Sequence, residues 1–474
     1  MPNRITRAAL LSAACSLFLV STAVAQEKSA PKVLERTTTS VEARAALTTA
    51  LDEVTNIGGG RRFDDKLQAV ITADPNFALG RAWYGAWMST LTPAERQTEL
   101  TRALQEAAAH GSTAEVLFIT ALRESRAGRN PVARNLLDVV LKLTPDDPDV
   151  HWARLLIAAD PEEALRLGAA GIKQFPAYAP IYNIHAYQLN SSGRSDEALA
   201  AVARYVELAP NHPNPHDSFA ELLQLNGRYD EADTHYVQAL AKDPQFDEAL
   251  IGRAEIAVLR RDYGTARSHL AQAMAMSRTP ARQQSLQRVV AATFVMEGKL
   301  KDAKAVMVKS IADGGNSSLN TIPDQRALAF LAALEGNSVE ARKTYPAPAA
   351  NAGANVPLSD VIMHTLLKRP ADVAKAVIAM EANAAAAPGN LDTQQAMFAA
   401  RVIGFVMKND LKAARAAQQQ VTGESYKALS SAFVAQAARK AGDKTLTQSS
   451  EADVEAYKDL TLNAGFARLI AARK

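Results

Sequence analysis

The close histidines are the residues of this sequence whose type and spacing come nearest to a metal site. His212 and His216 are four residues apart, and Asp217 follows directly. On a helix, that spacing would place both imidazoles on one face, where a divalent cation could bind. Pro213 and Pro215 instead indicate a turn. We therefore interpret this segment as a solvent-facing loop and predict no metal site.

A second candidate is the run Gly58–Gly60 followed by Arg61 and Arg62. Such a run could hold an anion at the start of a helix. It lacks the Lys-Ser/Thr pair of phosphate-binding loops, so a flexible turn is the favoured interpretation. The sequence also contains no dinucleotide fingerprint, no His-Glu-x-x-His and no Gly-x-Ser-x-Gly. We predict a protein that is not an enzyme and has no cofactor.

Trp83 and Trp87 are the third candidate, because a spacing of four places both indoles on one helix face. They could form an aromatic binding platform. Core packing is the favoured interpretation, because large aromatic side chains dominate core energetics.

The N-terminus has the pattern of a cleaved export signal. Arg4 and Arg7 precede an apolar run from Ala8 to Val20, and Ala23 to Ala25 form a small-x-small site. We expect residues 1–25 to be a signal peptide that is cut before Gln26. The protein would then be exported, to a periplasm or by full secretion.

The cysteine count and the balance of charges exclude further kinds of bond and partner. Cys15 is the only cysteine and leaves with the signal, so the mature chain can form no disulfide; lipid attachment at Cys15 is a weaker alternative. Of 53 basic residues, Arg4 and Arg7 lie in the signal, which leaves 51 against 50 acidic residues. The basic residues are scattered, so we expect no nucleic-acid partner. No later segment is apolar enough to predict an integral membrane span.

Helical repeats must position all of these side chains, because landmarks recur at fixed distances. Three landmark series are visible: Pro176, Pro210 and Pro244 at 34-residue intervals; Ala198, Ala232 and Ala266 at the same interval; and glycine five residues before alanine at Gly128/Ala133, Gly193/Ala198, Gly227/Ala232, Gly298/Ala303 and Gly336/Ala341. Glycine can take the left-handed conformation that ends a helix. Alanine fits where two helices cross, and proline ends the second helix. The unit is therefore helix, turn, helix, turn.

This pattern resembles the tetratricopeptide repeat family, most clearly from about Ala114 to Ser277. Departures are Arg261 in place of the turn glycine and a spacing of 31 residues between Pro145 and Pro176. The resemblance implies an all-α, right-handed superhelical solenoid of about nine to eleven antiparallel helix pairs.

The spacing of these landmarks and the local composition predict five segments along the chain. After the signal we expect a flexible mature N-terminus over 26–40, a repeat array over 41–344, and an Ala- and Pro-rich hinge over 345–357. Degenerate repeats would follow over 358–474, and they would end in a charged capping helix from Asp453 to Lys474.

In this family the first helix of each unit lines a concave face, so the resemblance also implies a binding surface. The matching positions are Asn183, Tyr187 and Asn190; Asp217, Glu221 and Gln224; and Glu248, Ile251, Glu255 and Val258. Independently, Asp217, Glu221 and Gln224 follow i, i+4, i+7 and share one helix face. An ordinary solvated face would show the same stripe, so that alternative stays open.

The function we predict is a non-catalytic extracytoplasmic scaffold or adaptor that binds another protein or an extended peptide. Amides and carboxylates would suit a polar or basic peptide, and the mapped positions lack the Lys and Arg that would grip a C-terminal carboxylate. The alternative is a periplasmic binder of a saccharide or lipid held between repeats.

Overall fold

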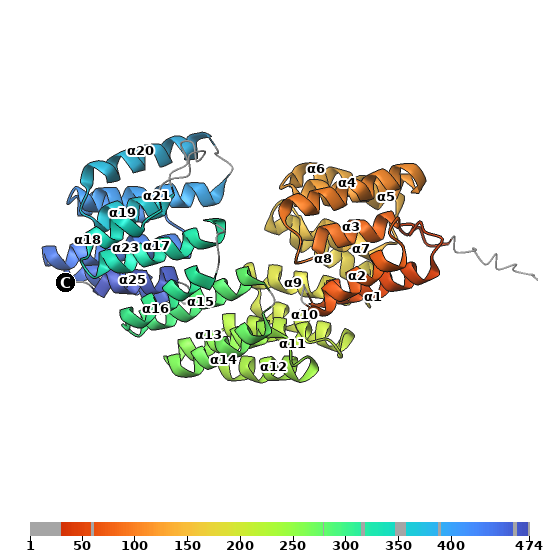
Figure 1. The fold of residues 1–474 in the computed structure, drawn as a ribbon, viewed down its shortest axis with the longest axis horizontal. Helices are drawn as coiled ribbons and strands as arrows, with labels where there is room; N and C mark the ends of the chain where they lie inside the picture. Colours follow the sequence, from red (N-terminus) through yellow and green to blue (C-terminus); the bar gives the residue numbers. More distant parts are fainter. Residues whose placement is uncertain are drawn as a thin grey trace, which may run out of the picture.

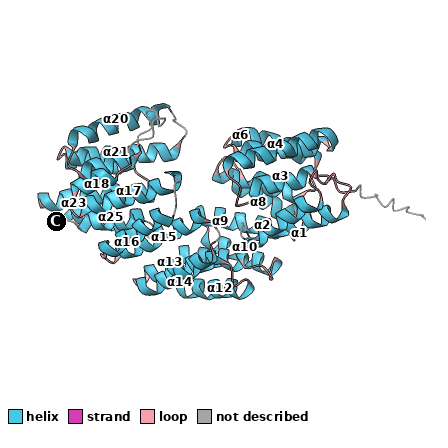
Figure 2. Cartoon of the chain, viewed as in Figure 1, coloured by secondary structure: helices cyan, strands magenta, loops and turns pink. Residues whose placement is uncertain are grey.

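The computed structural model describes residues 30–57, 61–277, 279–313, 318–346, 357–386, 390–457 and 462–472. The predicted signal peptide, the run Gly58–Gly60 and residues 347–356 of the predicted hinge lie outside the described residues. Within the described ranges all regular structure is α-helical (Figure 2).

The helices form an array of antiparallel pairs, as the sequence predicted (Figure 1). The described part contains twelve pairs and one further helix, more than the nine to eleven pairs expected. The pairs are α1 (Val41–Ile57) and α2 (Arg61–Ala73), α3 (Ala78–Trp87) and α4 (Pro93–His110), α5 (Thr113–Arg126) and α6 (Asn130–Leu143), α7 (Pro148–Leu156) and α8 (Pro161–Gln174), α9 (Ala179–Ser191) and α10 (Ser195–Leu208), α11 (Asn214–Leu225) and α12 (Tyr229–Lys242), α13 (Asp247–Leu259) and α14 (Tyr263–Met276), α15 (Pro280–Met296) and α16 (Leu300–Asp313), α17 (Ser318–Leu334) and α18 (Ser338–Thr344), α19 (Leu358–Leu366) and α20 (Pro370–Ala386), α21 (Leu391–Met407) and α22 (Leu411–Gln418), and α23 (Glu424–Ala441) and α24 (Lys444–Ala456), followed by α25 (Leu462–Ala472).

One turn geometry joins the two helices in nine of these pairs. The turn residue has a positive φ in each, and six of the nine residues are the glycines Gly128, Gly193, Gly227, Gly298, Gly336 and Gly442. The other three are Arg261, Lys368 and Asn409, with φ of 60°, 56° and 56°. Arg261 therefore occupies the place of the turn glycine, as the sequence predicted, although side chains disfavour this backbone region.

The residue five positions after each turn is buried at the crossing of the two helices. Its exposed fraction is 0% at Ala133, Ala198, Ala232, Ala266, Ala303, Ala341 and Ala414, 1% at Val373 and 9% at Thr447. The predicted role of the small residue is confirmed, because a larger group would hold the helices apart.

The pairs follow one another along a curved path, so that the ribbon has the outline of an open U (Figure 1). Helices α1–α8 form one arm, α15–α25 form the other, and α9–α14 join them. In the joining section the first helices α9, α11 and α13 lie on the side that faces the opening of the U, and α10, α12 and α14 lie on the outside.

The N-terminal segment 30–40, here named the N-terminal strap, is not the free chain that we expected. It is extended and crosses the first arm, and its backbone is held by contacts to residues that follow it by 78 to 114 positions. Leu34 is part of the core of that arm, at 7% exposure. Contacts over such distances along the chain leave no periodic signal in the sequence.

The C-terminal helix also differs from the expected charged cap. Helix α25 packs against α15, α17 and α23, the first helices of three different pairs. Phe466 and Ile470 are buried, and the Phe466 ring lies edge-on to Phe330 at 5.6 Å between centroids. Its apolar residues follow a helical spacing, and that face is covered by the second arm.

The two sides of the predicted hinge belong to one hydrophobic core. Tyr345 packs against that core, and its hydroxyl bonds to the carboxylate of Asp360 on the far side of the segment. The continuous core extends from Ala291 to Ala471, so the array is not divided into separate cores at residues 345–357.

Candidate functional site

The predicted binding residues lie on α9, α11 and α13, the first helices of three successive pairs. Tyr187 of α9 donates a hydrogen bond of 2.5 Å to Oε2 of Glu221 on α11. Gln224 of α11 donates one of 2.9 Å to Oε2 of Glu255 on α13. The structure therefore brings these four side chains into one row across three repeats, with 31 to 34 residues between bonded partners.

Asp217 lies in the same row and is surrounded by carboxylates. Burial raises the pKa of Asp217 well above its ordinary value, and the negative charges of Glu221, Glu248 and Glu255 raise it further. Burial likewise raises the pKa of the Tyr187 hydroxyl, with an added contribution from Glu221. The face thus concentrates negative charge, which is stabilised when a cation approaches.

One basic residue already pairs with this row. Arg282 of α15 donates bonds to Oδ2 of Asp247 at 3.1 Å and to Oε1 of Glu248 at 2.7 Å. The sequence reasoning missed Arg282, although it follows Glu248 by one 34-residue period. We refer to Tyr187, Asp217, Glu221, Gln224, Glu248 and Glu255 as the central acidic face.

The two predicted asparagines have different surroundings. Asn190 accepts a hydrogen bond of 2.9 Å from the amide of Asn226, so it links α9 to the end of α11. The Oδ1 atom of Asn183 is buried and has no hydrogen-bond partner within the described chain. Asn190 therefore has a structural contact of its own, and Asn183 offers an acceptor that this chain leaves unused.

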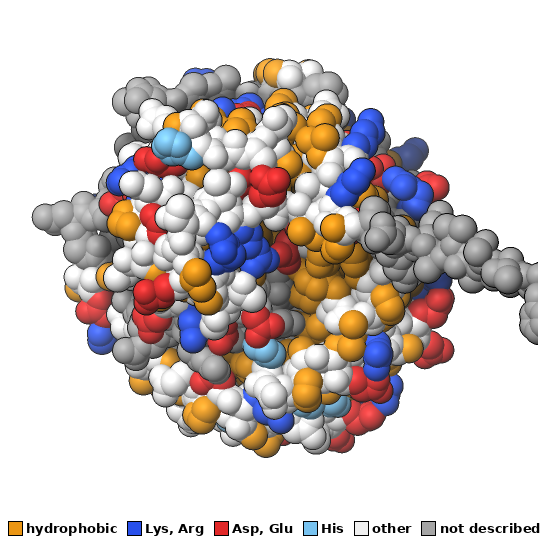
Figure 3. Space-filling view, turned by 90° about the vertical axis from the view of Figure 1, so that its right-hand side faces the viewer, with side chains coloured by type: hydrophobic (Ala, Val, Ile, Leu, Met, Phe, Trp, Pro, Cys, Tyr) orange, Lys and Arg blue, Asp and Glu red, His pale blue; other side chains and the backbone are white. Residues whose placement is uncertain are grey.

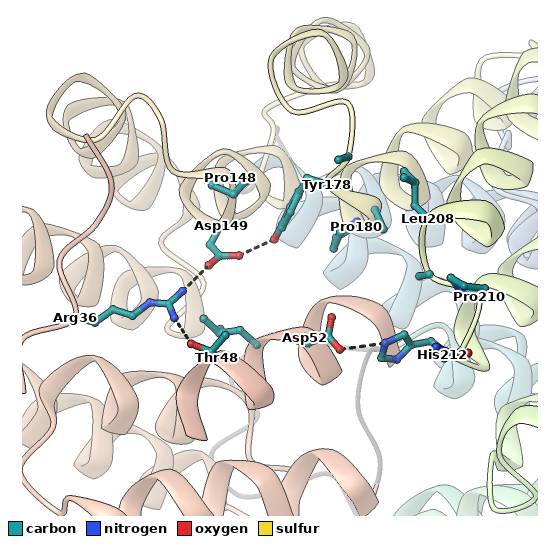
Figure 4. A pocket seen from close by; sticks show the side chains of 15 residues that line it. Arg36, Thr48, Asp52, Pro148, Asp149, Tyr178, Pro180, Leu208, Pro210 and His212 are labelled. Atoms are coloured by element: carbon teal, nitrogen blue, oxygen red, sulfur yellow. Dashed lines mark hydrogen bonds and ion pairs between the residues drawn. The ribbon is translucent and has the colours of Figure 1, made fainter. Parts of the chain in front are cut away.

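The two histidines of the predicted turn face different partners. His212 points its Nε2 at Oδ2 of Asp52 on α1, at 3.1 Å (Figure 4). His216 faces His235 of α12 instead, with 3.1 Å between their Nδ1 atoms. The described residues contain no cluster of three or more groups able to hold a metal ion. His212 lies in the turn before α11, as expected, whereas His216 and Asp217 lie in the first turn of α11, which begins at Asn214.

The tryptophans are part of the first arm's core. Trp83 is 1% exposed and stacks on Trp87 and on Trp152 of α7, each at 6.3 Å between ring centroids. Phe118 of α5 completes the cluster at 6.2 Å from Trp83. The packing interpretation is confirmed for Trp83. Trp87 is partly exposed, and the guanidinium of Arg126 lies 4.2 Å from its ring centre.

Charges elsewhere on the molecule are mixed. Acidic and basic side chains are interspersed on the face shown in Figure 3, and no continuous basic area is visible there. None of the helices in the described ranges has the length and apolar character needed to cross a bilayer.

No family model matches the sequence, and no curated protein matches it. Solved structures do match in fold. A thermophilic tetratricopeptide repeat protein of Thermus thermophilus shares 18% identity, with 38% of this chain and 99% of that chain covered and a TM-score of 0.34. PilW, a widely conserved type IV pilus biogenesis factor, shares 17%, with coverages of 44% and 97% and a TM-score of 0.36. A tetratricopeptide repeat protein of Parabacteroides merdae shares 13%, with coverages of 59% and 96% and a TM-score of 0.37.

These similarities concern the fold alone. The 34-residue units, their left-handed turns and the buried small residue after each turn define this chain as a repeat protein of the tetratricopeptide type.

Proposed function

We propose that this chain is a non-catalytic extracytoplasmic scaffold that binds another polypeptide on the central acidic face. The observation that carries the proposal is the row of polar side chains contributed by three successive first helices, linked across the repeats by the bonds from Tyr187 to Glu221 and from Gln224 to Glu255. A row of this kind spans several residues of an extended peptide, because each repeat adds one more set of contacts.

The chemistry of the row favours a peptide with basic side chains. Glu221 and Glu248 are exposed, and the charges around Asp217 are of one sign. Arg282 bonds to two carboxylates at once, which is the geometry that an incoming arginine would reproduce.

The extracytoplasmic part of the proposal is supported by the signal-like sequence of residues 1–25. Mass spectrometry of the N-terminus of the protein purified from its host tests this part alone. A first residue of Gln26 supports export by the predicted route, and an intact leader contradicts it.

The binding proposal is tested by crosslinking the mature protein in its native envelope and identifying what is captured. The test variant is Asp217→Asn, Glu221→Gln and Glu248→Gln. The matched control is Asp196→Asn, Glu197→Gln and Glu231→Gln, which removes the same three charges from exposed positions on the second helices α10 and α12.

We expect a stoichiometric protein partner with the wild-type chain and the control, and at least a tenfold lower yield with the test variant. Equal capture by both variants would show that the partner binds elsewhere. Capture of no protein by the wild-type chain would contradict the scaffold proposal itself.

A further inference from the structure

The N-terminal strap lies in the first arm as a peptide lies in a binding site. The N–H of Lys32 donates to Oδ2 of Asp146 at 2.8 Å, and the carbonyl of Lys32 accepts from the N–H of Asp146 at 3.1 Å. The N–H of Leu34 donates to Oδ2 of Asp147 at 2.9 Å. The strap is therefore held through its main chain, by residues more than a hundred positions away in sequence.

The next contacts are made by two threonines. The N–H of Thr37 donates to Oε1 of Glu115 at 2.9 Å, and its hydroxyl donates to Oε2 at 2.5 Å. The Thr38 hydroxyl donates to Asp74 at 2.5 Å. Glu115 is fully buried at 0% exposure, so these bonds are shielded from water.

The carboxylates that hold the strap also cap helices. Asp147 caps α7, since Oδ1 accepts from the N–H of Val150 at 3.0 Å while Oδ2 accepts from the strap. Glu115 does the same in the capping box of α5, where Oε2 accepts from the N–H of Ser112 at 2.9 Å. The cap fixes each carboxylate in position, so it presents a rigid acceptor to an extended main chain.

Selectivity then depends on few side chains. Leu34 is the strap residue that enters the core, and the Thr37 hydroxyl bonds to Glu115. Val33 and Glu35 are exposed. A different peptide could make the same contacts if it carried an apolar residue and, three positions later, a hydroxyl.

The strap does not fill the space around it. One cavity of about 410 Å³ lies between Arg36, α1 and the start of α9 (Figure 4). In this cavity Arg36 donates to Thr48 at 2.6 Å and lies 3.6 Å from Asp149. A second cavity of about 980 Å³ borders the strap from Val33 to Thr39. The site is therefore wider than its present occupant.

We propose that this site on the first arm is a second peptide-binding site, distinct from the central acidic face. It would bind extended peptides with an apolar residue followed three positions later by threonine or serine, and residues 30–40 compete for it in cis. The tethered strap has a high effective concentration, so a free peptide binds tightly only when the strap is weakened.

The test uses a fluorescent peptide with the sequence of residues 30–40 and follows its anisotropy as full-length mature protein is added. Leu34→Ala with Thr37→Val weakens the strap in cis. We expect this variant to bind the peptide at least tenfold more tightly than the wild-type chain does. Adding Glu115→Gln should lower that affinity at least tenfold, although glutamine still caps α5.

The matched control is Glu95→Gln, since Glu95 forms the same capping box with Thr92 on α4 and has no bond to the strap. It should leave peptide affinity unchanged. The proposal is overturned if the weakened variant, folded by circular dichroism, binds no peptide, or if Glu115→Gln and Glu95→Gln act alike.

If the double variant does not fold, hydrogen exchange measured on a single variant tests the proposal instead. In the chain that carries Thr37→Val alone, which loses the hydroxyl bond to Glu115, excess unlabelled peptide should accelerate exchange at residues 32–37 by displacing the strap, and unchanged exchange would refute the proposal. Neither experiment depends on the central acidic face, so the two proposals can fail separately.

Discussion

The turn residues of two neighbouring repeats offer a reciprocal test of how backbone conformation stabilises the array. Gly227 and Arg261 are 34 residues apart and occupy equivalent turns, with φ of 77° and 60°. A left-handed backbone costs a residue with a side chain about 1–2 kcal/mol, and it costs glycine almost nothing. We therefore expect Arg261→Gly to stabilise the protein and Gly227→Ala to destabilise it.

At both positions the change in stability should come from the backbone conformation alone. A Cβ atom at Gly227 would meet no atom within 4 Å, and Arg261 is exposed. Glycine gives the unfolded chain more freedom, which offsets about 0.4–1 kcal/mol of the gain. The net expectation is about 0.5–1 kcal/mol of stabilisation for Arg261→Gly and a similar loss for Gly227→Ala.

Urea unfolding followed by circular dichroism measures both changes. Gly264→Ala is the control, because Gly264 lies in α14 with an ordinary helical backbone and its nearest neighbour would be 3.7 Å from the new Cβ. It should change stability by a few tenths of a kcal/mol, in the stabilising direction. The reasoning is refuted if Arg261→Gly and Gly227→Ala shift the free energy of unfolding in the same direction.

Three further substitutions test other parts of the molecule. Phe466→Ala should lower stability by about 3–5 kcal/mol and expose α25 to limited proteolysis, because the ring is buried against Phe330; a mild effect would contradict the packing of α25. Asp217→Asn should raise the melting temperature at pH 7, because the folded state raises the pKa of this carboxyl and so disfavours its charge; the advantage should vanish as pH falls toward the ordinary value of 3.8. Burial lowers the pKa of His216 to about 4, so the wild-type chain should lose stability as pH falls from about 6.5 to about 4, and His216→Gln should lose less over that range in urea unfolding.

The repeat architecture could be predicted because its landmarks are local requirements. A left-handed turn needs glycine, and a helix crossing needs a small residue five positions later. Together with the proline that ends the second helix, these two needs located the pairs from Gly128 to Ala341, and the 34-residue spacing identified Arg261 as a turn residue despite its side chain.

The pattern of a turn glycine followed by alanine is absent where another residue type adopts the turn conformation or fills the helix crossing. Lys368 and Asn409 adopt the turn conformation, and Val373 and Thr447 replace the small residue. The pair α23–α24 was not predicted, because Thr447 follows Gly442 where alanine was sought. Helix α25 was misread for a related reason, since charged residues were noticed and the spacing of Phe466 and Ile470 was not.

The same difference between periodic and non-periodic features decides which parts of the candidate sites could be predicted from the sequence. Side chains on α9, α11 and α13 recur with the repeat period, so the sequence could place them on one face. The strap contacts have no period, because they join residues 30–40 to helix caps that follow by 78 to 114 positions. Only the folded chain brings the Asp147 and Glu115 carboxylates to that segment.

The polarity of the side chains on the inner faces of the array differs between its sections and matches what packs against each section. In the second arm, Phe330 and Leu429 of first helices are apolar and meet Phe466 and Ile470 of α25. In the first arm, Trp83 and its neighbours on the first helices pack against one another. The central helices place carboxylates and amides at their inner positions, and of these helices α9 and α11 are contacted by α1 of the first arm. Since an apolar inner face requires a cover and a charged one requires water or a polar partner, the change of chemistry at α9–α13 favours this section as the place where another molecule binds.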